Sequence, residues 1–302
     1  MKYREIKVNL AKNITDDFNA FLEQLHPLGY YEILFDPSLK KAGEIISDYT
    51  NIRIYLQEES VADEIRILIF LHSRAANDFF SETRIIETRE YMTSYQEYYK
   101  PFKAGEKIMV IPIWDKQNQE IVGTSDIPLY INPGLAFGTG HHETTKMMIS
   151  RLESVVEKND RILDAGCGSG ILSIAAARLG AASITAFDID PNAVDSSNYN
   201  WKENDFGSFP AFQCLEGGFD LPELQNQEFD LAVINITFAV ISANIQQIAR
   251  LKTRKFLFSG VIQEKEEELI SLLEKMAGGK AVFRDSLNDW ILIQWNRLPL
   301  EK

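Results

Sequence analysis

From residue 161 to its end, the chain alternates short apolar runs with longer segments of helical pattern. Alternation of this kind predicts a mostly parallel sheet with helices on both faces. The strands are expected at residues 161–165, 183–188, 211–214, 229–235, 254–259, 280–284 and 290–295. The helices are expected at residues 170–179, 191–204, 238–251 and 264–276. A short loop at 285–289 joins the last two strands, which are therefore expected to pair as an antiparallel hairpin.

Local residues support several of these helix ends. Asp190 precedes Pro191, and an acid before a proline in the first turn is a typical helix start. Gly180 and Gly278 follow two of the expected helices, where glycine commonly closes a helix.

The first strand of the alternating region leads into a glycine-rich turn. Residues 162–170 read Ile-Leu-Asp-Ala-Gly-Cys-Gly-Ser-Gly, so that Asp164 precedes Gly166, Gly168 and Gly170. Glycines between a strand and a helix let backbone N–H groups approach a ligand with no Cβ in the way. The turn therefore predicts a binding loop.

A second acid indicates what kind of ligand this loop binds. Asp188 lies 22 positions after Gly166, at the end of the next strand, where a carboxylate is placed to hold a ribose hydroxyl pair. A dinucleotide fingerprint needs a third small residue where this chain has Ile171, and the alternative register places only Ser173 there. No lysine follows the glycines, which argues against a triphosphate loop. A nucleoside-like cofactor without a pyrophosphate is expected.

The remaining pattern, D-x-G-x-G-x-G, resembles the cofactor loop of methyltransferases that use S-adenosylmethionine. In those enzymes the leading acid faces a cationic amino acid, and S-adenosylmethionine carries an ammonium and a sulfonium but no phosphate. Seven strands that end in an antiparallel hairpin also match the methyltransferase fold. The alternative is an ordinary glycine-rich turn in an α/β domain.

Composition narrows the class of protein. The chain has 302 residues, of which 45% are hydrophobic and 25% charged, as is typical of a soluble globular protein. No apolar run approaches the roughly 18 residues of a membrane helix, and the N-terminus lacks a signal-peptide core. Two cysteines make a disulfide framework implausible, so a cytoplasmic protein is expected. The net charge of −13 disfavours nucleic acid as substrate and favours a basic partner, unless it serves solubility alone.

The N-terminal third has a different organisation. Alternating apolar positions predict strands at 3–10, 30–35, 51–56 and 83–88, and helical patterns lie at 14–25 and 61–75. The order β-α-β-β-α-β suggests a small α+β ferredoxin-like domain. It carries no ligand motif, so a substrate-recognition role follows by elimination. The expected division is 1–92 for this domain, 93–124 for a linker with a helix and an extended arm, and 125–302 for the methyltransferase domain.

Two further segments are candidates for the site. Residues 132–145 contain three glycines and a proline, which mark a structured loop, and Thr144 and Thr145 can start the helix that follows. The alternative interpretation of this segment is a surface turn followed by a helix cap, with no role in the site. Asn235 ends a strand, and ligands of open α/β sheets sit beyond such ends. Its carbonyl is suited to accept a hydrogen bond from an attacking amine, unless Asn235 caps the next helix.

Together these motifs resemble the PrmA family, which methylates ribosomal protein L-eleven. The resemblance spans roughly residues 95–275 and rests on segments 133–140, 144–145, 164–170, 188–191 and 235–236, with similar connectors at 100–102 and 111–114. It implies a seven-stranded Rossmann-like class I methyltransferase domain behind a ferredoxin-like recognition domain. The implied S-adenosylmethionine contacts are Thr145, Asp164, Gly166, Gly168, Gly170, Asp188 and Asn235, with Asn235 nearest the transferred methyl. The implied loop near the reaction centre contains Phe137, Gly138, Thr139 and His142.

The chain departs from the family pattern at two places. His141-His142-Glu143 stands where the family has Thr-His-Pro, and Thr237 stands where it has Leu. Both departures lie near the expected reaction centre and leave the exact substrate open. No metal is expected, because the chain has only four histidines, Cys214 lies in a separate strand and no H-x-x-x-H spacing occurs.

The predicted reaction is an in-line transfer of a methyl group to a neutral amine of a lysine or of the protein N-terminus. His142 is expected to form hydrogen bonds within its loop, and the alternative is that it accepts the proton. Three hypotheses remain. The first is an amine methyltransferase of ribosomal protein L-eleven, and the second is an enzyme of the same fold with another protein or small-molecule substrate. The third is a cofactor-binding relative that has lost catalysis. The N-terminal domain favours a macromolecular substrate.

Overall fold

In the computed structural model, the chain is described over residues 2–25, 27, 29–33, 49–75, 78–87, 96, 99–133, 140–208 and 210–297. It forms two compact units, Met1–Lys100 and Pro101–Lys302. Within the described ranges, the structure contains no helix with the length and apolar character needed to cross a membrane.

The N-terminal unit has the predicted element order, β-α-β-β-α-β. Its elements are β1 (Lys2–Ala11), the 3-10 helix η1 (Lys12–Ile14), α1 (Thr15–Leu25), β2 (Gly29–Ile33), β3 (Tyr49–Gln57), α2 (Val61–Ala75) and β4 (Phe79–Glu87). The strands lie in the order β2-β3-β1-β4, and every pair is antiparallel. Residues 34, 35 and 88 of the predicted strands lie outside the described residues. The ferredoxin-like name stays a prediction.

One face of this sheet carries the core of the unit. Because side chains alternate between faces along a strand, Ile6 and Val8 of β1 and Ile54 of β3 point to the same side. They are buried against Phe18 of α1 and Leu71 of α2. The amphipathic pattern of the two helices is therefore explained by packing on a single sheet face.

The C-terminal unit contains the predicted seven-stranded sheet, in the order β10-β9-β8-β11-β12-β14-β13. Its strands are β8 (Arg161–Ala165), β9 (Ser183–Asp188), β10 (Ala211–Glu216), β11 (Leu231–Asn235), β12 (Lys255–Ile262), β13 (Lys280–Leu287) and β14 (Trp290–Asn296). All pairs are parallel except those made by β14, which is antiparallel to β12 and β13. The prediction of a mostly parallel sheet with an antiparallel ending is confirmed.

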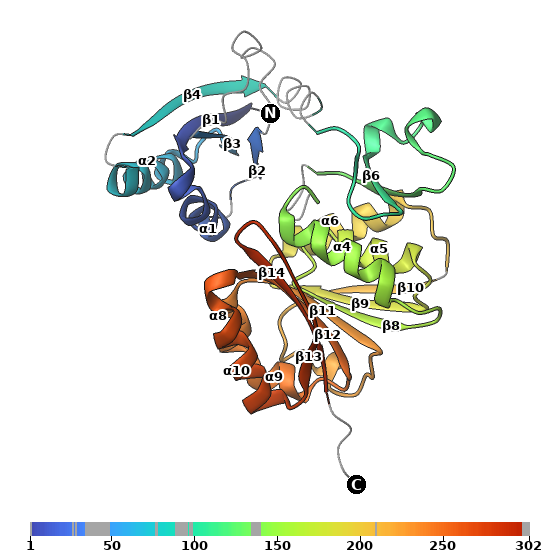
Figure 1. Cartoon of the computed structure of the whole chain (residues 1–302). Coiled ribbons are helices and arrows are strands. Elements are labelled where there is room, and N and C mark those ends of the chain that lie inside the picture. Colours follow the sequence, from blue (N-terminus) through green and yellow to red (C-terminus); the bar gives the residue numbers. More distant parts are fainter. Residues whose placement is uncertain are drawn as a thin grey trace. The chain divides into compact units, whose positions relative to one another are not determined.

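Helices cover both faces of this sheet, with α4, α5 and α6 on one face and α8, α9 and α10 on the other (Figure 1). Their bounds are α4 (Glu143–Val155), α5 (Ile171–Arg178), α6 (Pro191–Glu203), α7 (Pro222–Gln225), α8 (Phe238–Ala243), α9 (Ile245–Arg250) and α10 (Glu266–Ala277). The 3-10 helices are η3 (Ile113–Asp115), η4 (Gln119–Ile121) and η5 (Gln263–Lys265).

Three differences from the predicted elements occur between residues 238 and 289. The single helix expected at 238–251 is split into α8 and α9 at Asn244, whose backbone leaves the helical region and whose side chain donates to the carbonyl of Val240. Strand β12 continues past Ser259, because Gly260, with a φ of 78°, makes an irregularity that lets the pairing with β14 resume. The loop expected at 285–289 is a tight turn at Asn288 and Asp289, since β13 extends to Leu287.

Residues 102–131, which precede the seven-stranded sheet in the sequence, form a third, small sheet in the second unit. Strands β5 (Phe102–Lys103), β6 (Ile108–Pro112) and β7 (Ile127–Ile131) lie in the order β5-β6-β7. Part of the segment 93–124, predicted as a linker, thus pairs with β7 within the second unit. The carboxylate of Glu153 on α4 accepts from the N–H groups of residues 106–108 at 2.8–2.9 Å and ties this sheet to the helix layer.

Candidate functional site

The order of the strands creates a binding edge between β8 and β11. Chain connections run outward from β8 to β9 and β10 on one side and through β11 and β12 on the other, so the strand order reverses between β8 and β11. Ligands of open α/β sheets bind beyond the carboxyl ends of the strands at such a reversal. Ala165 pairs with Ile234, and the residues that follow them, Gly166 and Asn235, begin the candidate site.

The loop requires glycine for two reasons: its backbone angles have positive φ, and there is no room for a Cβ at two of its positions. Gly166, Gly168 and Gly170 have φ angles of 72°, 53° and 78°, which residues with a Cβ rarely adopt. A Cβ on Gly166 would lie 2.5 Å from Ile236 Cγ2, and one on Gly170 would collide with Ser197 Oγ. The loop therefore packs directly against the segment after β11 and against α6.

Asp188 holds this loop from the end of β9. Its Oδ2 accepts a hydrogen bond from the N–H of Gly168 at 2.9 Å, and its Oδ1 accepts one from the N–H of Asp190 at 3.1 Å. Burial raises the pKa of Asp188 despite these bonds. As predicted, Asp190 caps α6 by accepting from the N–H of Asn192 at 2.9 Å.

Ile189, directly after Asp188, was missed by the sequence analysis. Its side chain is 75% exposed, although it stands between two acids whose carboxylates are fixed by backbone N–H groups. A large apolar side chain in that position offers a flat surface for the apolar face of a ligand that Asp188 holds. The sequence offered one signal for this role, an apolar residue between Asp188, which ends a strand, and Asp190, which caps a helix.

Asp164 lies beneath the loop and is 1% exposed. Its Oδ2 accepts from Ser173 Oγ at 2.6 Å, and burial raises its pKa from 3.8 to about 6. Within the described part of the chain, neither Asp164 nor Asp188 takes part in an ion pair. Because a buried carboxylate is normally paired with a cation, Asp164, with the half-buried Asp188 beside the same loop, fits a ligand that carries positive charge.

Asn235 ends β11 beside the glycine loop. Its Oδ1 is buried and finds no hydrogen-bond partner among the residues that the structure describes. The N-cap of α8 is Thr237, so Asn235 does not cap that helix. The backbone after Asn235 is held closely, since a Cβ on Gly260 would lie 2.6 Å from the carbonyl oxygen of Ile236. An unpaired buried carbonyl is costly, which fits a ligand that donates to Asn235.

The segment 132–145 is described only at its ends. Phe137, Gly138 and Thr139 lie outside the described residues. Helix α4 starts one residue before the predicted Thr144, because the His142 side chain is the cap and accepts from the N–H of Thr144 at 3.3 Å. Thr144 and Thr145 are buried in the first turn of this helix.

Two neighbouring histidines hold the end of this segment in an apolar environment. The His141 ring stacks on Phe102 with centroids 4.0 Å apart, and burial, with Lys146 nearby, lowers its pKa to about 4. The His142 ring lies edge to face with Trp290 at 4.8 Å, and burial lowers its pKa as well. Both rings are therefore neutral near pH 7. The described residues contain no group of three or more His, Cys, Asp or Glu arranged to hold a metal ion.

Asn200 of α6 joins the two loops and was also missed. It is completely buried; its Nδ2 donates to the carbonyl of Ser169 at 2.9 Å, and its Oδ1 accepts from the N–H of Asn132 at 2.7 Å. The start of segment 132–145 and the glycine loop thus share one side chain. Its spacing from Ala193 and Ser197, which lie on the buried face of α6, was the only indication in the sequence that Asn200 is buried.

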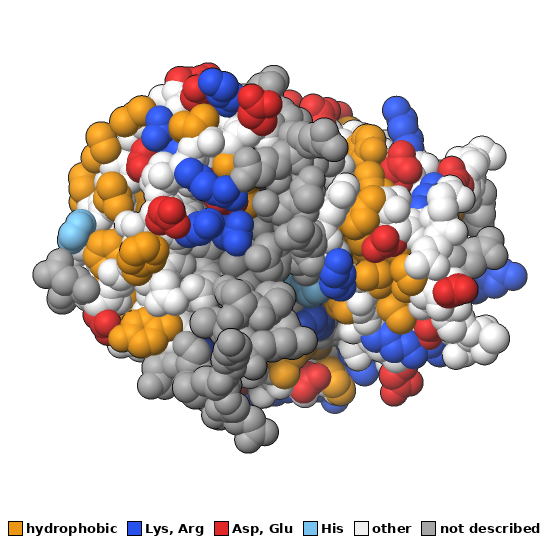
Figure 2. Space-filling model, turned by 90° about the horizontal axis from the view of Figure 1, so that it is seen from above, with side chains coloured by type: hydrophobic (Ala, Val, Ile, Leu, Met, Phe, Trp, Pro, Cys, Tyr) orange, Lys and Arg blue, Asp and Glu red, His pale blue; other side chains and the backbone are white. Residues whose placement is uncertain are grey.

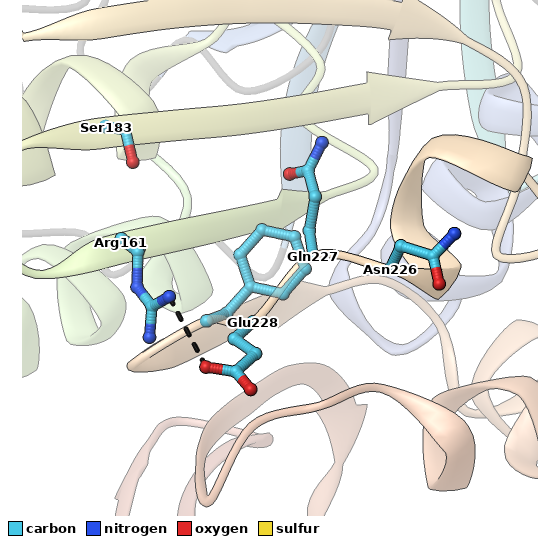
Figure 3. Close-up of a pocket in the computed structure, with 6 residues that line it drawn as sticks. Arg161, Ser183, Asn226, Gln227 and Glu228 are labelled. Atoms are coloured by element: carbon cyan, nitrogen blue, oxygen red, sulfur yellow. Dashed lines mark ion pairs between the residues drawn. The ribbon is translucent and has the colours of Figure 1, made fainter.

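A polar pocket lies at the opposite edge of the sheet and is not part of this site. Its volume is about 370 Å³, and it is lined by Arg161, Ser183, Asn226, Gln227, Glu228 and Phe229 (Figure 3). Arg161 and Ser183 are the first residues of β8 and β9, so the pocket adjoins the amino ends of the strands. The Arg161 guanidinium is already neutralised by Glu228 at 3.6 Å and Asp230 at 3.1 Å.

Comparison with known proteins agrees with this geometry. Residues 2–297 match the family described as ribosomal protein L11 methyltransferase (PrmA). A ribosomal protein L11 methyltransferase of Leptospira interrogans is 49% identical over 302 residues, which cover 98% of this chain and 99% of that protein. The Bacillus subtilis protein of the same name is 34% identical over 83% of this chain and 79% of its own. A crystal structure of a ribosomal protein L11 methylase from Lactobacillus delbrueckii subsp. bulgaricus superposes with a TM-score of 0.57 and 26% identity, over 66% of this chain and 99% of that one.

Proposed function

The chain belongs to the ribosomal protein L11 methyltransferase (PrmA) family, and from this premise we propose that it methylates amino groups of ribosomal protein L11 at the edge between β8 and β11. It is a protein methyltransferase with S-adenosylmethionine as its cofactor. The observation that supports the placement of the reaction most directly is the buried, unpaired Oδ1 of Asn235 beside the glycine loop.

The donor groups around the loop fit this cofactor. Gly166, Gly168 and Gly170 bring the backbone close to the ligand, and Asp188 at the end of β9 is placed to accept from ribose hydroxyls. Asp164 supplies buried negative charge for a cationic ligand. Ile189 offers an apolar surface next to Asp188. The proposed set is completed by Thr145 and Asn235, with Phe137, Gly138, Thr139 and His142 near the reaction centre.

Bound S-adenosylmethionine supplies an electrophilic methyl group on a sulfonium. The amine of the substrate has to be neutral when it reacts, because a protonated amine has no lone pair with which to attack the methyl group. At pH 7, deprotonation costs about 4.6 kcal/mol for a lysine of ordinary pKa and about 1 kcal/mol for an α-amino group. Asn235 Oδ1 accepts a hydrogen bond from the free amine and orients its lone pair. This bond is one part of the alignment of amine and methyl group, which in total recovers roughly 7–11 kcal/mol of a barrier.

The N-terminal unit is the proposed site of substrate recognition. Helix α2 buries Ile67 and Leu71 against its sheet but exposes Val61, Ile65 and Ile69 at 47%, 50% and 62%. These three residues, called here the α2 stripe, recur every fourth position and form one apolar helix face. Figure 2 shows hydrophobic side chains between basic and acidic ones on one face of the molecule. In this proposal the α2 stripe docks the ribosomal protein.

The proposal also covers the charge of the chain, its location and its division into domains. The net charge of −13 favours encounter with a basic ribosomal protein. A cytoplasmic location is proposed because ribosomal proteins are assembled there. The division at 1–92, 93–124 and 125–302 into recognition domain, linker and methyltransferase domain is part of the same proposal.

A transfer assay tests this function. The purified chain is incubated with S-adenosylmethionine labelled at the methyl group and with purified ribosomal protein L11, in parallel with a total ribosomal protein extract. Label in L11 at amino groups, located by mass spectrometry, supports the proposal. Label confined to other proteins of the extract contradicts the substrate, and cofactor binding without transfer to any protein contradicts catalysis.

A further inference from the structure

The fold brings the chain's two cysteines together. Cys167 is the second residue of the glycine loop, and Cys214 lies on β10, where it pairs with Ala186 of β9. Their sulfurs are 3.6 Å apart, although 47 positions separate them in the sequence. Neither thiol takes part in the methyl transfer proposed above. Since disulfide sulfurs are about 2.05 Å apart, a short movement of the loop toward β10 would close this pair.

The two thiols differ in access and in acidity. Cys167 is only 6% exposed, whereas Cys214 is partly exposed. The hydrogen bond between them raises the pKa of the Cys167 thiol and lowers that of Cys214, which Ser197 also lowers. Burial and the nearby carboxylates of Asp164 and Asp188 act against ionisation of both thiols, without reversing the shift of Cys214. The thiolate is the nucleophilic form of cysteine. Because it is the more exposed of the two, Cys214 is the thiol that reacts first with a reagent from solution.

We propose that Cys167 and Cys214 form a thiol–disulfide site that controls the cofactor loop, with small disulfides such as oxidised glutathione as the reagent. The Cys214 thiolate attacks one sulfur of the reagent and forms a mixed disulfide; the released thiolate takes up the proton that Cys214 lost. The Cys167 thiolate then attacks Cys214 Sγ, and the second glutathione leaves and is protonated in turn. The two cysteines lose two electrons in total, and one glutathione disulfide is reduced to two thiols.

The consequence for the cofactor follows from the loop's hydrogen bonds. The N–H of Cys167 donates to the carbonyl of Phe187 at 3.0 Å, and that of Gly168 donates to Asp188 at 2.9 Å. A bond that draws Cys167 toward β10 displaces the neighbouring Gly168 from Asp188. The oxidised chain therefore binds S-adenosylmethionine more weakly. This step rests on the proposed location of the cofactor.

Binding and oxidation are then reciprocally linked. If the disulfide weakens cofactor binding by a given factor, bound cofactor shifts the thiol–disulfide equilibrium toward the thiols by the same factor. A change of about tenfold or more is expected, within the ordinary range of such coupling. Cofactor availability would thereby protect the loop from oxidation.

The test uses the full chain equilibrated in graded mixtures of oxidised and reduced glutathione. The fraction of intramolecular disulfide is read as a loss of two hydrogen masses under non-reducing conditions, and cofactor affinity is measured by calorimetry. The expected result is a disulfide that weakens binding, is reversed by dithiothreitol and is opposed by S-adenosylhomocysteine. Cys214→Ser, which leaves Cys167 without a partner, should keep the reduced affinity and lose all sensitivity to glutathione; Cys214→Ala serves as a second variant.

Three results would overturn this inference: only mixed disulfides or linked dimers, no oxidation at equilibrium, or an oxidised chain that binds the cofactor as tightly as the reduced one. Failure of the reduced wild-type chain to bind S-adenosylmethionine would contradict the proposed function instead. Formation of the disulfide is measured independently of that binding, so the two failures are distinguishable.

Discussion

Asp188 Oδ2 accepts the N–H of Gly168 at 2.9 Å, so the acid at the end of β9 fixes the loop that follows β8. The second oxygen of the same carboxylate accepts from Asp190. A carboxylate that receives two backbone N–H groups has both oxygens oriented before a ligand arrives. Such preorganisation reduces the entropy that binding would otherwise cost.

Asp188→Asn replaces one acceptor oxygen by an NH₂ group, which then faces a backbone N–H donor. Loss of a hydrogen bond to a charged group lowers affinity by about tenfold to a hundredfold. Calorimetric titration with S-adenosylhomocysteine measures this change. Asp285→Asn, at an exposed carboxylate on β13 that accepts from the N–H of its neighbour Ser286, serves as the control. Wild-type affinity in Asp188→Asn would contradict the assigned role.

Asn235→Ala should reduce kcat much more than cofactor affinity. The variant removes the buried Oδ1 that is proposed to orient the amine. Removing one positioned hydrogen-bonding group at a reaction centre typically costs about 10²–10³ in kcat. Single-turnover methylation and cofactor titration separate the two effects. Asn244→Ala, at a side chain that donates to the carbonyl of Val240 away from the glycine loop, is the matched control. Normal turnover in Asn235→Ala rules out the role.

Asn200→Ala should weaken both the fold and cofactor binding. The change removes the two hydrogen bonds that Asn200 makes with the carbonyl of Ser169 and the N–H of Asn132. Two such bonds contribute about 1–3 kcal/mol to the free energy of unfolding, which denaturant unfolding measures. Asn198→Ala, one half-turn away and exposed, is the control. A variant as stable as the wild type, with unchanged affinity, would show that this link does no more than fill space.

The raised pKa of Asp164 predicts that the free energy of unfolding depends on pH. Its pKa is about 6 in the folded chain against 3.8 ordinarily. Between these values the folded chain binds more protons than the unfolded chain, so the free energy of unfolding falls as pH rises through this window. The loss contributed by this one group amounts to at most about 3 kcal/mol. Unfolding curves of ligand-free wild type and Asp164→Asn, compared at about pH 4 and about pH 7, should show the variant gaining relative stability at the higher pH. Parallel curves at both pH values would disprove this account.

The α2 stripe predicts a change in substrate affinity alone. Ile65→Lys and Ile69→Lys should raise the KM for ribosomal protein L11 by about fivefold or more, the effect expected of a contact residue worth over 1 kcal/mol. Cofactor affinity should not change. Val282→Lys, at an exposed apolar residue of β13, is the control. Equal effects of all three substitutions would contradict a specific docking role.

Much of the second unit was predictable from local patterns. The bounds of β8 and β9 agree with the prediction because each is a short apolar run between polar residues and a glycine or an acid. The break at Asn244 was not predictable, because the apolar pattern of 238–251 continues through it. Strand β5, with two residues, is too short to leave a period-two signal.

The candidate site divides in the same way. The glycines of the loop and the acid Asp188 are recognisable in the sequence, since a turn with positive φ and a strand end depend on neighbouring residues. Asn200, which joins Ser169 to Asn132, and the 3.6 Å approach of Cys167 to Cys214 are not recognisable there. Those contacts depend on the order of the strands and on how α6 packs against the sheet. The sequence by itself determined the cofactor loop and its class of ligand; only the tertiary structure decided which distant side chains support that loop, because packing brings together residues that no local pattern connects.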